Sequence, residues 1–255
     1  LRSSSELDLG VVTRDDTPDD VDLEMMLDDL PQYLGGNRLA TYILPDNYDP
    51  RTPMPLILSL HGYTGTARGQ DRYFELSEYT RRHGIILILP NGRLNPEGNR
   101  FWSATDHCCD LYDQGDQDLA YLVGLIDEAK RYFTIDENTI AIIGHSNGGF
   151  MGYRLACEAA DVITHVVSLA GASWYNPDHC SDPKPVSVLQ IHGSLDLVIR
   201  YEGQQFTEGD PDAMWNIEPC WNLLCREPQS LCAESAACAE IWSCMNRCGW
   251  DGINE

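Results

Sequence analysis

The sequence is organised around short apolar runs that alternate with stretches of helical pattern. Five runs (PLILSL, IILILP, TIAIIG, THVVSLAG and VSVLQIHG) begin at residues 55, 85, 139, 164 and 186, and an alternating run covers 39–44. Helical patterns lie between them, near 71–82, 116–132 and 148–159. Near-continuous apolar runs are typical of strands buried on both faces. Their alternation with helices predicts an α/β fold, with a mostly parallel central sheet and helices on both faces. In such sheets the chemistry lies at the carboxyl ends of the strands.

The composition restricts the possible partners. The 255 residues carry 40 acidic and 17 basic side chains, which gives a formal net charge of −23. Such a surface repels nucleic-acid backbones and anionic lipid head groups, so a neutral substrate is expected. No apolar run approaches the roughly 20 residues that span a bilayer. The sequence therefore predicts neither a nucleic-acid nor a membrane partner.

Ten cysteines are many for a chain of this size, and six of them fall within the last 36 residues. Clustered cysteines without a CxxC pair and without nearby histidines predict disulfides rather than a zinc site. Disulfides indicate an oxidising compartment, so we expect a secreted or periplasmic protein whose signal peptide has been removed. Cys108 and Cys109 are expected to pair with different cysteines, with Cys157 and Cys180 available.

The first 34 residues are strongly acidic. The pattern over 17–30 predicts a short amphipathic helix, with Thr17 as its cap and Pro18 in its first turn. The aspartates of this segment lack the spaced ligands and central glycine of a calcium-binding loop. We therefore expect the acidic side chains of this segment to form a face exposed to solvent.

The run TIAIIG leads directly into GHSNGG and then into a helical segment. A GxSxG sequence between a strand and a helix is the pattern of a nucleophile elbow, a sharp turn that exposes the serine hydroxyl. Gly144 and Gly148 leave room for the turn, and Gly149 lets the helix start close to its neighbours. We therefore predict that Ser146 is a catalytic nucleophile. The alternative is a tight turn that contains an incidental serine.

A serine nucleophile needs two backbone N–H groups that face the developing negative charge. One should belong to Asn147, the residue after the nucleophile. The run PLILSL is followed by the loop HGYTGT, and the second donor is assigned to the main chain of Tyr63, with Gly62 and Thr64 as alternatives. His61 is interpreted as a structural hydrogen-bonding residue rather than as a base.

The acid that orients a catalytic histidine should follow the serine in the chain, just after a later strand. Asp196 stands at this place in VSVLQIHGSLD, and Asp182 is a weaker rival. No histidine follows Asp196. His145 lies inside the elbow, where its side chain is expected to point away from the pocket. His179, in the loop after an earlier strand, is a low-ranking candidate for the base.

Four segments carry a resemblance to a known family: PLILSLHGYTGT, RFWSATDHCCDLYDQGDQDLAYLVGLIDE, GHSNGGFMGYRLACE and VLQIHGSLDLVIRYEG. They resemble the polyhydroxybutyrate-depolymerase-like esterases of the α/β-hydrolase superfamily, a group that includes feruloyl esterases. The resemblance covers roughly residues 38–203. It implies the α/β-hydrolase fold, with Ser146 as nucleophile and Asp196 as the acid of the triad. Of an acidic pair usual in the family only Asp118 matches, and it is interpreted as a structural residue at a helix start.

The resemblance also suggests a division of the chain. The expected parts are an acidic extension (1–34), a hydrolase core (35–203), a Cys-rich insertion or lid (204–238) and a return to a core helix (239–255). Trp242, Asn246 and Cys248 fit that helix. The last strand and the triad histidine of the family would come after it, which implies a separate segment that carries them. An inactive relative, or His179 as the base, are the alternatives.

Aromatic residues near the strand ends are candidates for holding the substrate. Tyr63 and Trp174 are predicted to contact it, with core packing as the alternative for Trp174, whereas Trp102 is expected to pack in the core beside the paired cysteines. The sequence thus predicts a secreted serine carboxylesterase for neutral esters, either a polyhydroxyalkanoate-type polyester or feruloyl and acetyl esters. It predicts no metal and no organic cofactor. The alternative is a non-catalytic binding or regulatory relative that has lost its histidine.

Overall fold

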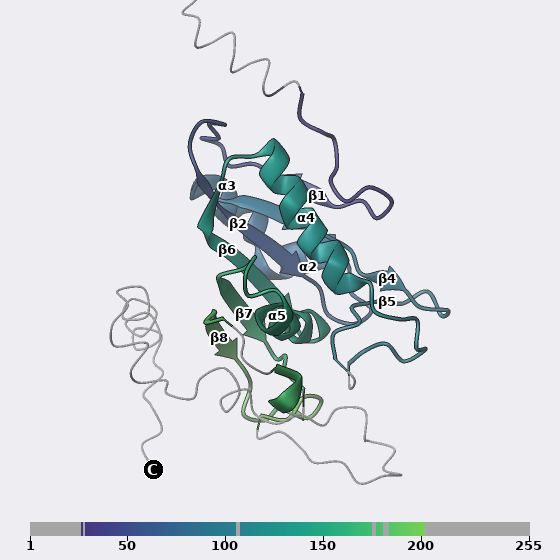
Figure 1. Cartoon of the computed structure of the whole chain (residues 1–255). Helices are drawn as coiled ribbons and strands as arrows, with labels where there is room; N and C mark the ends of the chain where they lie inside the picture. Colours follow the sequence, from purple (N-terminus) through teal and green to yellow (C-terminus); the bar gives the residue numbers. More distant parts are fainter. Residues whose placement is uncertain (1–26, 28, 106–107, 175–176, 181–183, 202–255) are drawn as a thin grey trace, which may run out of the picture.

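The computed structural model describes residues 27, 29–105, 108–174, 177–180 and 184–201. The core of this part is a six-stranded sheet in the order β1-β3-β2-β6-β7-β8, and only β1 runs antiparallel to its neighbour (Figure 1). The strands are β1 (Thr41–Ile43), β2 (Met54–Leu60), β3 (Ile86–Leu89), β6 (Ile135–His145), β7 (His165–Leu169) and β8 (Ser187–Ile191). The predicted α/β fold with a mostly parallel sheet is confirmed.

Helices cover both faces of the sheet. They are α2 (Ala67–Phe74), α3 (Leu76–Arg82), α4 (Asp118–Tyr132) and α5 (Asn147–Glu158), with a short 3-10 helix, η1 (Pro177–Cys180), and a two-stranded hairpin of β4 (Arg93–Leu94) and β5 (Arg100–Phe101). Helices α4 and α5 lie on one face and α2 and α3 on the other (Figure 1). None of the described helices is long and apolar enough to cross a membrane.

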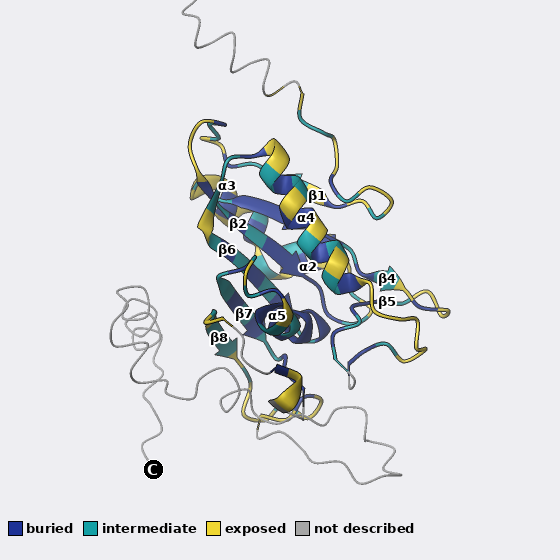
Figure 2. Cartoon of the chain, in the orientation of Figure 1, coloured by how far each residue is buried: buried dark blue, intermediate teal, exposed yellow. Residues whose placement is uncertain are grey.

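The alternation of side chains along β3 explains the two layers. Ile86 and Ile88 belong to the large core under α4 and α5, whereas Leu87 and Leu89 belong to the smaller core under α2 and α3. Since successive side chains of a strand point to opposite faces, a strand between two helical layers must be apolar throughout. Figure 2 shows β2 mostly buried, β6 mostly of intermediate burial, and the outer sides of the helices exposed.

The observed elements differ from the expected ones mainly at their ends. Strand β6 begins at Ile135, four residues before the apolar run, because Ile135 pairs with Met54 of β2. The expected helix near 71–82 is divided into α2 and α3 at Glu75, which has a φ of 55°. Most of the predicted helix over 17–30, and the segments 204–238 and 239–255, lie outside the described residues.

Candidate active site

Ser146 lies in a sharp turn at the carboxyl end of β6. Its φ and ψ are 50° and −121°, a conformation that residues with side chains rarely adopt. The turn is held by a hydrogen bond of 2.8 Å from the Ser146 N–H to the carbonyl of Leu169 in β7, and α5 begins at the next residue. This is the local geometry of a nucleophile elbow, in which the serine side chain projects from the end of the strand.

The glycines around Ser146 permit close contacts between backbones. A Cβ atom on Gly148 would overlap the carbonyl group of Leu60 in β2, and one on Gly144 would overlap the backbone of Gly148. A Cβ atom on Gly149 would come within 3.0 Å of the Gly171 Cα atom. The helix therefore starts against the ends of β2 and β7, as the glycine pattern predicts.

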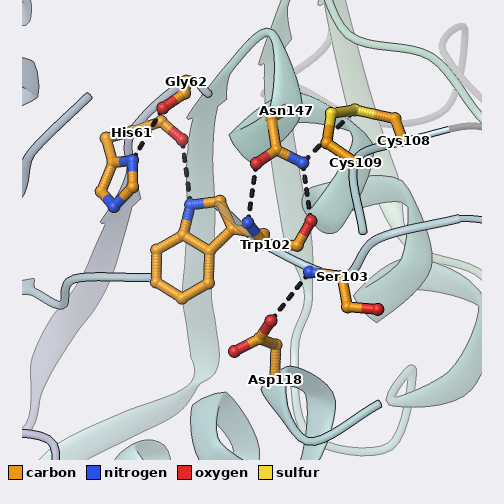
Figure 3. The surroundings of a disulfide bond; sticks show 8 residues. All are labelled: His61, Gly62, Trp102, Ser103, Cys108, Cys109, Asp118 and Asn147. Atoms are coloured by element: carbon orange, nitrogen blue, oxygen red, sulfur yellow. Dashed lines mark hydrogen bonds between the residues drawn. A yellow bond between two sulfur atoms is a disulfide. The ribbon is translucent and has the colours of Figure 1, made fainter. Parts of the chain in front are cut away.

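The side chain of Asn147 fastens this turn to the loop around Trp102 (Figure 3). Its Oδ1 accepts a hydrogen bond of 2.7 Å from the Trp102 N–H, and its Nδ2 donates to the Trp102 carbonyl at 2.8 Å. Nδ2 also lies 3.3 Å from the Sγ atom of Cys108. The sequence pattern pointed only to the main chain of Asn147, because an amide side chain gives no signal of a partner 45 residues away.

His61 has a structural role, as its interpretation from the sequence expects. Its Nδ1 donates to the Gly62 carbonyl at 2.8 Å, and its Nε2 accepts from the Gly92 N–H at 2.9 Å. Burial lowers the pKa of His61 from 6.5 to about 4. Trp102 is fully buried and donates from Nε1 to the His61 carbonyl at 2.9 Å, which confirms its core position.

The loop after β2 and the start of α5 each present one free N–H group near Ser146. Within the described part of the chain, the N–H groups of Tyr63 and Asn147 have no hydrogen-bond acceptor, whereas the N–H of Thr64 donates to the Arg100 carbonyl at 2.8 Å. A donor to a developing oxyanion has to be unpaired before the substrate binds. Thr64 therefore drops out as a candidate, and Tyr63 and Asn147 keep the required freedom.

A cavity of about 400 Å³ lies between this loop, helix α2 and the elbow. Its lining consists of Gly62, Tyr63, Gly65, Thr66, Gly69, Gln70, Tyr73, His145, Ser146 and Val198. The prediction that His145 points away from the pocket is wrong, since its ring is 5.5 Å from that of Tyr73 and it belongs to the lining. Burial lowers the pKa of His145, and the charge of Asp196 opposes that shift.

Asp196 lies in the loop after β8, on the same edge of the sheet. Its Oδ1 accepts hydrogen bonds from the N–H groups of Val198 and Ile199, at 2.8 and 3.0 Å. Its Oδ2 lies 3.5 Å from Nε2 of His192, which donates to the Ile199 carbonyl at 2.6 Å. One carboxylate oxygen therefore shapes the turn, and the other remains available to a further donor.

Trp174 and His179 lie apart from the cavity lining. The Trp174 side chain is 5% exposed, and its ring is stacked on that of His179 at 6.0 Å. The predicted contact of Trp174 with substrate, and the candidacy of His179 as a base, stay predictions. Within the described residues, no histidine nitrogen is hydrogen-bonded to the Ser146 hydroxyl.

The cysteines pair differently from the prediction. Cys108 and Cys109 form a disulfide with each other. Cys157, at the end of α5, pairs with Cys180 in η1. The expectation that Cys108 and Cys109 meet separate partners is wrong. The six cysteines of the last 36 residues lie outside the described residues.

Asp118 begins α4 and is fully buried, as the structural interpretation expects. Its carboxylate pairs with Arg38, lies 3.6 Å from Nε of Arg93, and accepts the Ser103 N–H at 2.8 Å (Figure 3). These contacts fix the segment that leads from Trp102. Among the described residues, no group of three histidine, cysteine or acidic side chains could hold a metal ion.

The comparison with known proteins agrees with this architecture. A family model described as phospholipase/carboxylesterase matches residues 51–216. The chain belongs to this family.

Curated relatives of this phospholipase/carboxylesterase chain include two proteins at 31% identity. One is described as a putative esterase NocK of Nocardia uniformis subsp. tsuyamanensis, matched over 65% of this chain and 46% of its own length. The other is described as a probable feruloyl esterase C of Aspergillus flavus, matched over 64% and 57%. The chain thus spans about half the length of the curated relatives it matches.

Among solved structures, a crystal structure of a thermostable esterase is similar at a TM-score of 0.50 and 20% identity. The match covers 64% of this chain and 44% of that one. This likeness supports the α/β-hydrolase fold, which the family match and the parallel sheet also indicate.

Proposed function

We propose that this protein is a serine carboxylesterase that hydrolyses neutral esters through an acyl-enzyme on Ser146. The observation that carries the proposal is the placement of Ser146 in a strained turn at a cavity, beside the unpaired N–H groups of Tyr63 and Asn147. Strained conformations persist where the surrounding structure holds them, and they concentrate at active sites.

In the proposed reaction, the Ser146 hydroxyl attacks the ester carbonyl carbon and gives its proton to a base. The N–H groups of Tyr63 and Asn147 stabilise the tetrahedral oxyanion, and the alcohol leaves as it receives the proton. Water then attacks the acyl-enzyme, and the acid is released. Asp196 is assigned to orient the histidine that carries the proton.

The hydrogen bonds of two histidines in the chain exclude them as the group that carries this proton. His61 and His192 use both ring nitrogens in hydrogen bonds to other groups. In chain order the triad histidine should follow Asp196, and no histidine does so in the printed sequence. We therefore assign the base to a histidine on a further segment, with His179 as the alternative within the chain.

The net charge of −23 supports a neutral ester as the substrate. The similarity to a probable feruloyl esterase C and to a bifunctional acetylxylan esterase/xylanase favours feruloyl or acetyl esters over an aliphatic polyester. The Cys157–Cys180 disulfide supports an oxidising compartment, and hence secretion.

The test is hydrolysis of p-nitrophenyl butyrate by the protein together with the further segment that carries the assigned histidine, by the same material with Ser146→Ala, and by the same material with Ser187→Ala, which removes an exposed serine of β8 as a control. Activity should fall at least a thousandfold in Ser146→Ala and stay unchanged in the control. A fluorophosphonate probe should label Ser146 alone. Absence of both hydrolysis and labelling would contradict the proposal and favour a non-catalytic relative.

A further inference from the structure

Two rings from different elements meet in the wall of the cavity beside Ser146. Tyr73 belongs to the last turn of α2, and His145 is the last residue of β6, directly before the nucleophile. Their ring centroids lie 5.5 Å apart at an angle of 41°, and both side chains line the cavity. Tilted rings at this distance make a favourable aromatic contact. The cavity therefore has a corner formed by two flat, unsaturated surfaces.

The ring of His145 is held in place while its nitrogen atoms stay open. A Cβ atom on Gly62 would come within 3.3 Å of Nδ1, so the ring lies close against the loop after β2. Within the described part of the chain, neither ring nitrogen has a hydrogen-bond partner, and neither is buried. Burial lowers the pKa of His145 from its ordinary 6.5, so the ring is uncharged at neutral pH. An uncharged ring in a cavity wall suits a neutral partner.

Tyr73 is anchored by a neighbouring ring and still largely uncovered. Its centroid lies 5.3 Å from that of Phe74, which packs against the smaller core under α2 and α3. Tyr73 itself is 63% exposed. Because aromatic side chains bring a large apolar area to a contact, a ligand that covers this ring gains free energy from its burial.

The rest of the lining leaves room for a flat group. Gly62, Gly65 and Gly69 contribute no side chains, and Val198 adds an apolar one. The volume of about 400 Å³ lies within the range of sites that take small organic molecules. The net charge of −23 disfavours an anionic ligand. A neutral, planar ring fits these conditions.

We propose that Tyr73 and His145 determine specificity by stacking on an aromatic ring of the ester substrate. Since the two rings are tilted toward each other, a third ring can meet both at the offset or edge-to-face angles that aromatic pairs favour. The site then prefers esters with an aromatic ring, on the acid or on the alcohol, over saturated esters of the same size. This inference rests on the proposed function, because it takes the cavity beside Ser146 as the place of the ester.

Ester binding to the Ser146→Ala form of the material used for the hydrolysis assay tests the inference without turnover. Methyl 3-phenylpropanoate and methyl 3-cyclohexylpropanoate carry the ring on the acid, and 2-phenylethyl acetate and 2-cyclohexylethyl acetate carry it on the alcohol. Dissociation constants are measured by NMR titration. In at least one pair the phenyl-bearing ester should bind about two to ten times more tightly, and that pair identifies the side of the ester. A cavity that is merely apolar gives the opposite order, because the cyclohexyl group buries more apolar surface.

Tyr73→Leu should remove most of this preference, because leucine is apolar but has no ring, and Tyr73→Phe should retain it. Folded His145→Gln should lower it as well. Tyr79→Leu is the matched control, since Tyr79 is exposed on α3 and its ring is stacked on that of His83 at 4.1 Å, outside the cavity lining. This control should leave the preference unchanged.

Three results overturn the inference: no phenyl preference in either pair, no binding of any of the four esters, or a preference that survives undiminished in Tyr73→Leu or in folded His145→Gln. Hydrolysis and probe labelling of the protein with Ser146 intact, measured separately, decide the proposed function. Each idea can therefore fail alone.

Discussion

The surroundings of Ser146 and those of Asp196 are built in different ways. Ser146 follows a central strand and is held by backbone contacts with β2 and β7, through glycines that leave no spare space. Asp196 follows β8, which is the outermost strand on its side of the described sheet, in a loop where Leu195 and Leu197 are each 89% exposed. The Ser146 turn is held by close backbone contacts with β2 and β7, and the Asp196 loop is fixed mainly by its own turn.

This difference shows which part of the proposed catalytic site is determined by a short motif. The conformation of Ser146 is imposed by neighbours that the sequence GHSNGG makes possible, so the motif and the geometry coincide. The Asp196 carboxylate is held in place by hydrogen bonds from the N–H groups of Val198 and Ile199. The catalytic role that we propose for it depends on a histidine that the motif does not contain.

The largest expected effects are those of replacing the carboxylates of Asp196 and Asp118, the first on activity and the second on stability. Asp196→Asn should lower ester hydrolysis by about 10³–10⁴-fold, because an amide cannot hold the imidazolium that forms during the reaction. The free energy of unfolding should change by less than about 1 kcal/mol, since the amide oxygen can still accept from the N–H groups of Val198 and Ile199. Activity assays and urea unfolding measure the two effects.

Asp118→Asn is the matched change in a buried carboxylate. It leaves Arg38 without its counter-charge and should lower the free energy of unfolding by about 3 kcal/mol, while the folded fraction keeps its activity. Full activity in Asp196→Asn would refute the catalytic role of Asp196. Loss of activity in folded Asp118→Asn would contradict its structural role.

Gly148 in the Ser146 turn and Gly193 in the Asp196 loop should respond differently to an added Cβ atom. Gly148→Ala would force a Cβ atom into the Leu60 carbonyl group and should destabilise the protein by about 3 kcal/mol. Gly193→Ala, in the Asp196 loop, places its Cβ atom 4.0 Å from the nearest backbone nitrogen. It should be neutral or stabilise by up to about 1 kcal/mol, because alanine lowers the entropy of the unfolded chain. Equal losses in urea unfolding would show that the two regions are packed alike.

The sequence predicted the parts of the molecule that depend on local pattern. Apolar runs identified the six strands of the sheet, and the strand-GxSxG-helix order located Ser146 at the end of β6. The direction of the His145 side chain and the pairing of Cys108 with Cys109 were predicted wrongly. The direction of the His145 side chain depends on a tertiary contact with Tyr73, which no spacing rule contains, whereas the Cys108–Cys109 disulfide joins two adjacent residues.

His61 should make the free energy of unfolding decrease as the pH falls. Its pKa is about 4 in the folded protein and about 6.5 when unfolded, so the unfolded chain binds the proton first as the pH falls. Stability from this group is complete above pH 6.5 and is lost toward pH 4, by about 2 kcal/mol at pH 5. Urea unfolding of the protein and of His61→Asn between pH 7 and 4.5 checks this. An equally steep decline in the variant would assign the pH dependence to other groups.

The smallest expected effect concerns the exposed leucines beside Asp196. Leu197→Ala should change the free energy of unfolding by less than about 0.5 kcal/mol, because an 89% exposed side chain has little packing to lose. The same substitution at Leu58, which is fully buried in β2, should cost about 2–5 kcal/mol from lost burial and the cavity that remains. Chemical unfolding of both variants measures the contrast. A loss of 2 kcal/mol or more in Leu197→Ala would mean that this side chain is packed, and the distinction between a closely packed Ser146 turn and an open Asp196 loop would then fail.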